Sequence, residues 1–350
     1  MTGNFMIYGA TGYTGKLVAK AAKEAGLAPL LAGRNEAKVK AVAEPLGFSW
    51  RAFSLDDSAA LDAALKQVDL VLHIAGPFSR TSKQMVDACL RTGRHYLDIT
   101  GEIAVLAACA ARDEDAKNRN IMIMPGVGFD VVPSDCLAAH MKKRLPDATE
   151  LTLAIGGLEK MSRGTAKSSM ESVGDPVKVR RAGRVESVWP PPRRTIDFGK
   201  GPRPALAVGW GDVFTAYFST GIPNITVYFE SLPQLEQMAK MGGFLRWLLS
   251  TPPMQAVLKF WADTQPEGPT DAERASGFGI LIGEAVNAKG DKRVSRLRVP
   301  EGYTLTAMTS LEIVRRVLSG DYKEGFQTPS LVYGEDFITQ YQNCVMEDLV

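Results

Sequence analysis

Cysteine and histidine are scarce in this sequence. Its 350 residues include four cysteines and three histidines, and neither a Cys-x-x-Cys nor a His-x-x-x-His pair occurs. The cysteines are Cys89, Cys109, Cys136 and Cys344. Such wide spacing fits neither a disulfide framework nor a zinc site. We therefore expect no bound metal, and we expect a reducing compartment, which is the cytoplasm.

Long apolar runs and an excess of one charge are also missing. No stretch reaches the roughly 18 consecutive apolar residues that a membrane-spanning helix needs. The first residues show no basic segment followed by an apolar one, so we expect neither a transmembrane segment nor a signal peptide. Because 41 basic residues face 39 acidic ones, the net charge is only +2. This balance argues against nucleic acid as the main partner.

The order of the apolar segments indicates an α/β protein of two domains. At about 150 residues per domain, 350 residues suffice for two domains, or for one large α/β unit with an insertion. In the first part of the chain, short apolar strands alternate with amphipathic helices. This alternation predicts a doubly wound parallel sheet of the Rossmann type. The strands are expected at residues 4–8, 30–32, 50–53, 68–75, 95–99 and 121–124.

Beyond Pro133 the pattern changes, because strands follow one another without regular helices between them. The strands are expected at residues 151–155, 205–208, 225–229, 278–288 and 294–299. Residues 160–203 are rich in Arg, Gly and Pro and predict long loops, whereas Lys289-Gly290-Asp291 predicts a hairpin turn. We therefore expect a second, mixed α/β domain with a largely antiparallel sheet.

A glycine-rich segment lies between the first expected strand and the first expected helix. Glycines lack a Cβ, so they allow a tight turn and let the backbone approach a pyrophosphate at the helix N-terminus. A Walker-type loop is excluded because Lys16 is followed by Leu17. The alternative is a glycine-rich turn without a ligand. The residues expected to hold the cofactor phosphates are Gly9, Ala10, Thr11, Gly12, Tyr13, Thr14 and Gly15.

The end of the second strand bears on the choice between NAD and NADP. At this position NAD sites place an acid near the ribose, and NADP sites place an arginine for the 2′-phosphate. The sequence has Arg34 and Asn35 here. A guanidinium pairs with a phosphate through two hydrogen bonds, whereas a carboxylate would repel it. An ordinary solvated arginine is the alternative, but the sequence favours NADP.

Several motifs resemble the saccharopine dehydrogenase-like oxidoreductase family, and the similarity is greatest for the bacterial branch that includes trans-acting enoyl reductases. The motifs are Gly9–Gly15, Ala32–Asn35, Ala75–Phe78, His95–Glu102 and Gly128–Asp135, with weaker similarity at residues 163–166, 220–224 and 303–307. The resemblance implies an NADP-binding Rossmann domain at residues 1–133, to which residues 303–350 return. It also implies that residues 134–302 form the inserted α/β domain for substrate and dimerisation.

The resemblance further implies which residues surround the cofactor. The segments that match the ribose-phosphate site and the nicotinamide side of the family comprise Arg34, Asn35, Ala75, Gly76, Pro77, Phe78 and Thr100. Glu102 and Asp130 match segments that face the nicotinamide and the substrate.

Glu102 and Asp130 are the candidate catalytic residues. Each follows a strand of the expected parallel sheet, at the end where such sheets bind ligands. Either carboxyl group could act as acid or base or hold the substrate. The alternative for Asp130 is to cap a turn or helix. No tyrosine is followed four residues later by lysine, which argues against a short-chain dehydrogenase.

Residues 238–261 are unusually apolar and aromatic. They predict two helices broken by Pro252-Pro253, packed in the core or at a dimer interface. The alternatives are an apolar lid over a lipid-like substrate and an interfacial membrane contact. Large exposed apolar patches are uncommon on monomers, so we expect a homodimer through this segment or through the sheet of the second domain.

These observations and the resemblance indicate an NADPH-dependent oxidoreductase that transfers a hydride to a carbonyl, an imine or an activated C=C bond. The expected substrate is a small or lipid-linked molecule. Two alternatives stay open. One is a sensor or scaffold that binds NADP without turnover, and the other is a reductase acting in trans on carrier-bound acyl chains.

Overall fold

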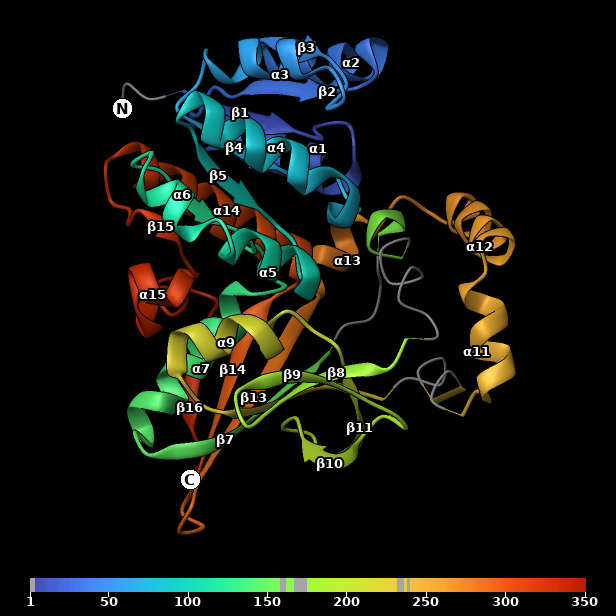
Figure 1. The fold of residues 1–350 in the computed structure, drawn as a ribbon, viewed down its shortest axis with the longest axis vertical. Coiled ribbons are helices and arrows are strands. Elements are labelled where there is room, and N and C mark those ends of the chain that lie inside the picture. Colours follow the sequence, from blue (N-terminus) through green and yellow to red (C-terminus); the bar gives the residue numbers. More distant parts are fainter. Residues whose placement is uncertain (1–3, 158–161, 167–174, 232–235, 238–239) are drawn as a thin grey trace. The chain divides into compact units, whose positions relative to one another are not determined.

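The computed structural model in Figure 1 describes residues 4–157, 162–166, 175–231, 236–237 and 240–350. The chain forms two compact units. The first comprises residues up to Val132 together with Tyr303–Val332, and the second comprises Pro133–Gly302 together with Tyr333–Val350. The expected return of the whole segment 303–350 to the first unit is therefore corrected at its end. Residues 333–350 stay with the second unit because a strand at 345–348 pairs with that unit's sheet.

The first unit contains a seven-stranded parallel sheet, as the alternation of strands and helices predicts. The strand order is β15-β6-β5-β4-β1-β2-β3, which contains the 3-2-1-4-5-6 order of dinucleotide-binding folds. The strands are β1 (Phe5–Tyr8), β2 (Leu30–Gly33), β3 (Trp50–Ala52), β4 (Leu70–His73), β5 (His95–Asp98), β6 (Met122–Met124) and β15 (Gly325–Phe326). The side chains of β1 and β4 are buried throughout, as expected for a sheet covered on both faces.

Helices connect these strands (Figure 1). They are α1 (Tyr13–Glu24), α2 (Glu36–Leu46), α3 (Ser58–Leu65), α4 (Phe78–Thr92), α5 (Ile103–Ala110), α6 (Asp113–Lys117) and α14 (Gly302–Leu318). In α1, Val18, Ala19 and Ala22 are buried, so the apolar side of this helix packs and its polar side faces solvent.

The second unit contains a mixed, largely antiparallel sheet. Its order is β10-β11-β12-β7-β13-β14-β16, with β8 paired to β12 and β9. Only the β12–β7 pair is parallel among the pairs of this described sheet. The strands are β7 (Ala148–Gly156), β8 (Val177–Arg181), β9 (Arg184–Val188), β10 (Arg193–Asp197), β11 (Pro202–Val208), β12 (Asn224–Glu230), β13 (Phe278–Asn287), β14 (Lys292–Pro300) and β16 (Val345–Asp348). The expected hairpin turn between β13 and β14 is present, with Gly290 at a φ of +86°.

The expectation of long loops over residues 160–203 is wrong for most of the described part of that segment. Strands β8, β9 and β10 lie there, and β8 and β9 form a hairpin. Their arginine-rich composition hides buried or partly buried positions such as Val179 in β8 and Ile196 in β10, whereas Arg181, Arg184 and Arg193 are exposed. Strands with one exposed face tolerate such charges, so composition alone was misleading.

The two faces of the second sheet differ. A Cβ on Gly283 of β13 would lie 2.8 Å from Met141 and 3.0 Å from Leu137, so α7 (Val132–Arg144) packs closely on this face. The remaining helices of this unit are α9 (Asp212–Thr220), α11 (Gly243–Ser250), α12 (Pro252–Thr264), α13 (Asp271–Ser276) and the 3-10 turn η1 (Glu335–Phe337), whereas α15 (Pro329–Tyr333) belongs to the first unit up to Val332. On the opposite face, Tyr228 and Ile282 belong to a cluster with partly buried neighbours.

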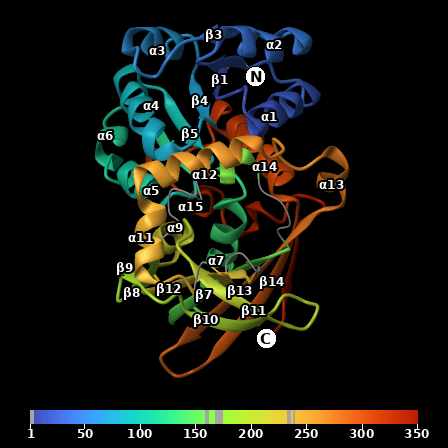
Figure 2. The same cartoon turned by 90° about the vertical axis from the view of Figure 1, so that its right-hand side faces the viewer.

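Helices α11 and α12 are separated at Thr251, as the Pro252-Pro253 pair predicts (Figure 2). Residues 238–239 of the expected segment lie outside the described residues. The aromatic side chains of both helices are largely exposed, with 75% of Phe244, 61% of Trp247 and 73% of Phe260 accessible. Packing of these rings in the core is therefore excluded. Within the described parts of the chain, no helix is both long and apolar enough to cross a bilayer.

Candidate functional site

The glycines of the loop between β1 and α1 have three different environments. Gly9 has a φ of +96°, and a Cβ there would lie 2.7 Å from the Ala75 nitrogen. A Cβ on Gly15 would lie 2.3 Å from the Gly9 oxygen, so this glycine allows α1 to pack against the loop. A Cβ on Gly12 would meet only the Gly9 oxygen, at 3.5 Å. Gly12 therefore leaves open the side from which a pyrophosphate would approach.

Gly12 is also the N-cap of α1. Glycine has no side chain that could cap the helix, and the first turn contains no acidic residue. The first amides of any α-helix lack partners within the helix and carry the positive end of its dipole. The loop and helix start thus fit an anionic diphosphate on steric and electrostatic grounds.

Arg34 and Asn35 follow β2 at the same edge of the sheet. Arg34 is exposed. Burial raises the pKa of the Tyr8 hydroxyl to about 12, and the positive charge of Arg34 opposes this rise. The Asn35 Oδ1 accepts a hydrogen bond from the Lys38 amide at 3.0 Å and caps α2. The oxygen of Asn35 is therefore committed to the helix, whereas the Arg34 guanidinium is presented to solvent, where it suits a phosphate.

The loop at residues 75–78 is held from two sides. The hydroxyl of Thr81 donates to the Ala75 oxygen at 2.7 Å. The Glu102 carboxylate accepts the Phe78 amide on Oε1 at 2.8 Å and the Ser79 amide on Oε2 at 2.7 Å. Glu102 thus caps α4, whose preceding residue Pro77 offers no side-chain cap. This observation assigns Glu102 a positioning role that the sequence did not suggest.

His73 lies at the end of β4, immediately before this loop. It is buried, and its Nε2 lies 3.0 Å from the Thr81 Oγ1. Because the Thr81 proton goes to the Ala75 oxygen, the ring nitrogen is the donor in this contact. Burial lowers the pKa of His73 to about 3, so the ring is neutral near neutral pH. His73 thereby supports the loop indirectly, through Thr81.

Asp98, at the end of β5, is a residue of the site that sequence reasoning missed. Its buried carboxylate accepts hydrogen bonds from the Tyr96 hydroxyl at 2.6 Å, the Thr100 amide at 2.8 Å and the Gly126 amide at 2.9 Å. Burial raises its pKa to about 6, against the opposing effect of these bonds. Asp98 ties the segments after β5 and β6 together. The signal in the sequence that could have identified Asp98 is an acidic residue at the end of an otherwise largely apolar strand.

Thr100 and Gly101 continue from Asp98 toward the second candidate carboxyl group. The Thr100 hydroxyl accepts a hydrogen bond from the Glu102 amide at 3.0 Å, so its oxygen shapes the turn. A Cβ on Gly101 would lie 3.1 Å from the Asp130 Oδ2. Gly101 therefore provides the space that the Asp130 carboxyl group occupies.

Asp130 is the second partly buried carboxyl group of this site, beside Glu102. No hydrogen bond engages its side chain among the residues that the structure describes, so it does not act as a cap there. Burial raises its pKa to about 7, and the negative charge of Glu102 contributes. The neighbouring Phe129 amide donates to the Thr306 hydroxyl at 3.0 Å, which fixes the segment to α14. Asp130 is thus a carboxyl group able to hold or release a proton near neutral pH.

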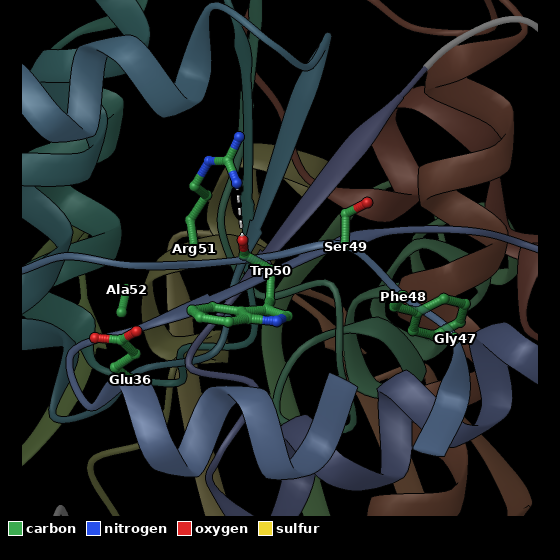
Figure 3. A pocket seen from close by; sticks show the side chains of 7 residues that line it. All are labelled: Glu36, Gly47, Phe48, Ser49, Trp50, Arg51 and Ala52. Carbon is green, nitrogen blue, oxygen red and sulfur yellow. Dashed lines mark hydrogen bonds between the residues drawn. The ribbon is translucent and has the colours of Figure 1, made fainter. Parts of the chain in front are cut away.

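A separate cavity of about 640 Å³ flanks β3, and Figure 3 shows its side chains. Trp50 lies along it, and the Arg51 guanidinium donates to the Trp50 oxygen at 3.2 Å. The lining residues are Glu36, Gly47, Phe48, Ser49, Trp50, Arg51 and Ala52. They include none of the residues expected to bind a cofactor, so this cavity is distinct from the candidate site.

Comparisons with known proteins agree with the geometry of the first unit. Residues 5–124 match the family model "Saccharopine dehydrogenase NADP binding domain". The chain is 33% identical over 150 residues to a trans-acting enoyl reductase of Mycobacterium leprae, which is 41% of this chain and 36% of that protein. It is 26% identical over 215 residues to a human saccharopine dehydrogenase-like oxidoreductase, or 54% of this chain and 50% of that protein. The matches thus span half or less of these relatives. The expected NADP-binding Rossmann domain is confirmed.

Among solved structures, the chain resembles apo saccharopine dehydrogenase (L-Glu forming) from Saccharomyces cerevisiae. The TM-score is 0.68, with 99% of this chain and 100% of that chain covered. The sequence identity is 11%, so this likeness shows a shared fold and nothing about substrate. The expected fold class, a Rossmann unit with a second mixed α/β unit, is confirmed.

The contrast between Gly12 and Gly15 generates a first prediction. We expect Gly12→Val to abolish NADPH binding, because the side chain would fill the approach of the pyrophosphate, while stability changes by only about 1 kcal/mol. Gly15→Ala should instead lower the free energy of unfolding by about 1–3 kcal/mol, because its Cβ meets backbone. Calorimetric titration and urea unfolding measure the two quantities. NADPH binding by a folded Gly12→Val variant would contradict this assignment.

A second prediction concerns Arg34. Arg34→Ala should weaken NADPH binding about ten- to a hundredfold, since a charge-assisted pair contributes about 1.5–3 kcal/mol, and it should leave NADH binding unchanged. Arg119→Ala removes the same charge at another exposed position and serves as the control. Titration of all three proteins with both cofactors measures the effect. Equal affinity of the native protein for NADPH and NADH would refute the preference.

Proposed function

We propose that this chain, whose residues 5–124 belong to the saccharopine dehydrogenase NADP-binding family, is an NADPH-dependent oxidoreductase of the saccharopine dehydrogenase-like type. The bond to be reduced is a carbonyl, an imine or an activated C=C bond in a small or lipid-linked molecule. The observation that carries the proposal is Asp130, a partly buried carboxyl group with a raised pKa in the cofactor-binding unit. Perturbed carboxyl groups of this kind gather at catalytic sites.

The proposed roles follow from the contacts of each residue. The loop at Gly9–Gly15 and Arg34 hold the cofactor, which when bound supplies hydride-transfer chemistry. Reduction of a double bond also requires a proton, and we assign its delivery to Asp130. Because burial raises the pKa of Asp130 to about 7, its carboxyl group can carry a proton near neutral pH. Glu102 positions the loop at residues 75–78 and keeps the Asp130 pKa high through its charge.

A trans-acting enoyl reductase of carrier-bound acyl chains is a second candidate function. The similarity to the Mycobacterium leprae protein favours it over a general ketone reductase. In that case the reduced bond is the C=C bond of an α,β-unsaturated thioester. Loss of NADPH absorbance with unsaturated acyl thioesters, ketones and imines distinguishes these substrates. Tight NADPH binding without consumption of any of them would support a sensor instead.

The proton-donor role of Asp130 generates a third prediction. Because an acid catalyst works only in its protonated form, turnover should fall as the pH rises through about 7. Asp130→Asn should lower turnover about 10²- to 10⁴-fold and remove this decline. NADPH affinity should stay close to that of the native protein. Steady-state rates measured between about pH 5.5 and 9, a range on both sides of neutral pH, test both effects.

Two further variants sharpen the test of Asp130. Glu102→Gln removes a charge that raises the Asp130 pKa, so the decline in rate should move to lower pH. Asp321→Asn alters an exposed carboxyl group and should leave the profile unchanged. An unchanged profile in Asp130→Asn would assign the proton to another group.

A cytoplasmic location and a homodimer complete the proposal. All four cysteines are buried and free, which suits a reducing compartment. On the face of the second sheet opposite α7, Ile196, Ile280 and Val294 are only partly buried around Tyr228 and Ile282. Aliphatic side chains that are half-covered in one chain suit burial against a second copy related by two-fold symmetry.

The homodimer is a fourth prediction. Light scattering at micromolar concentration should give a mass near twice the 37.9 kDa of one chain. Ile280→Glu should yield monomers, because burying a carboxylate at an interface is costly. Trp247→Glu changes an exposed side chain of α11 and should leave the dimer intact. A monomeric native protein would exclude the dimer. A monomeric Trp247→Glu variant of a dimeric native protein would instead assign the interface to α11.

A further inference from the structure

Helices α11 and α12 present a group of large apolar side chains to solvent. We refer to Phe244, Trp247, Val257, Phe260 and Trp261 as the aromatic face. Each is more than half exposed, and the Phe244 and Trp247 rings lie 5.9 Å apart. Single exposed apolar side chains are ordinary, but five of them on two consecutive helices mark a surface that contacts something else.

The aromatic face is separate from the side of α12 that packs. Ala262 is fully buried, and Met254 and Leu258, at spacings of four, are half-buried. Val257 and Trp261 follow the same spacing on another side of the helix and are exposed. The helix therefore has one apolar side in contact with protein and a second apolar side that is not needed for that contact.

Hydrogen bonds join the end of α11 to the start of α12. The Gln255 Nε2 donates to the Leu249 oxygen at 2.9 Å, and the Thr251 hydroxyl donates to the Leu248 oxygen at 2.7 Å. The Gln255 amide also donates to the Thr251 oxygen at 2.9 Å. These bonds link the end of α11 to the first turn of α12.

The sequence of this segment carries more positive than negative charge. Residues 240–264, which include both helices, contain three basic residues, Lys240, Arg246 and Lys259, and one acidic residue, Asp263. At the average frequency of the chain, with 39 acids in 350 residues, about three acids would occur there. A second copy would bring the same cations to a two-fold interface, where they would repel one another. An anionic surface would instead attract them.

We propose that α11 and α12 dock the protein on an anionic lipid surface through the aromatic face. Phe and Trp side chains are favoured at the boundary between headgroups and acyl chains, and flanking Lys and Arg residues attract anionic lipids. At about 1.5 Å per residue, the 13 residues of α12 extend about 20 Å, too short to cross a bilayer. The helices lie in the plane of the interface. This docking goes beyond the proposed oxidoreductase function and does not require turnover.

Flotation of the full chain with lipid vesicles tests the docking. We expect the native protein to float with vesicles of phosphatidylcholine and phosphatidylglycerol, to float much less with phosphatidylcholine alone, and to be released by high salt. The double variant Phe260→Ser/Trp261→Ser should bind about tenfold more weakly or less. The changed side chains are exposed, so circular dichroism should show an unaltered fold.

A matched control and a second readout separate the aromatic face from other surfaces. Phe218, on α9, is 43% exposed, and Phe218→Ser should leave vesicle binding unchanged. Tryptophan fluorescence should shift to the blue on vesicle addition, and Trp247→Phe/Trp261→Phe should lose this shift. Failure of the native protein to float, equal binding to neutral vesicles, or undiminished binding of the double variant would each overturn the proposal. Monomerisation by the double variant without native vesicle binding would assign the face to a second copy instead.

Discussion

Two amides at the start of α4 donate to one carboxylate, that of Glu102, and the geometry of the candidate site depends on this pair of bonds. The Phe78 and Ser79 amides lie 2.8 and 2.7 Å from the two carboxylate oxygens. The bonds link the segment after β5 to the loop after β4, so that neighbouring strand ends hold their loops in fixed relation. Without Glu102, helix amides would lose their partners, since the preceding Pro77 has no capping side chain. The same charge also acts on Asp130 and raises its pKa.

The polar groups around this carboxylate have two kinds of role, because some hold the loops in place and one is the proposed proton donor. Asp98 has three hydrogen-bond donors and ties two strand ends together, although its own pKa is raised to about 6 by burial. His73 is neutral and acts on the loop through Thr81. Asp130 differs because its carboxyl group is not committed to a hydrogen bond among the described residues. A proton donor needs this freedom, since a carboxylate held by several amides would lose the proton too readily.

What the sequence predicted well was local in the chain. The positions of the glycine loop and the apolar strands depend on residues that are close together in the chain, and the parallel sheet follows from the alternation of strands and helices. The partners of Glu102 lie 23 and 24 residues away, and those of Asp98 include Gly126, so spacing alone could not identify these contacts. Strands β8 to β10 were missed because their exposed sides carry the arginines that suggested loops. The pairing of β16 with β14 is equally non-local.

The apolar segment at residues 240–264 shows a limit of a different kind. Periodicity identifies which sides of a helix are apolar, but it does not identify what covers them. In α12, both the side with Ala262 and the side with Trp261 are apolar, and the pattern therefore predicts a helix packed in the core or at a dimer interface. The structure buries the first side and exposes the second. Exposed tryptophan and phenylalanine carry a solubility cost that the fold does not offset. Because three cations and a single acid, Asp263, accompany these rings, an anionic surface offsets that cost better than a like-charged copy of the same face.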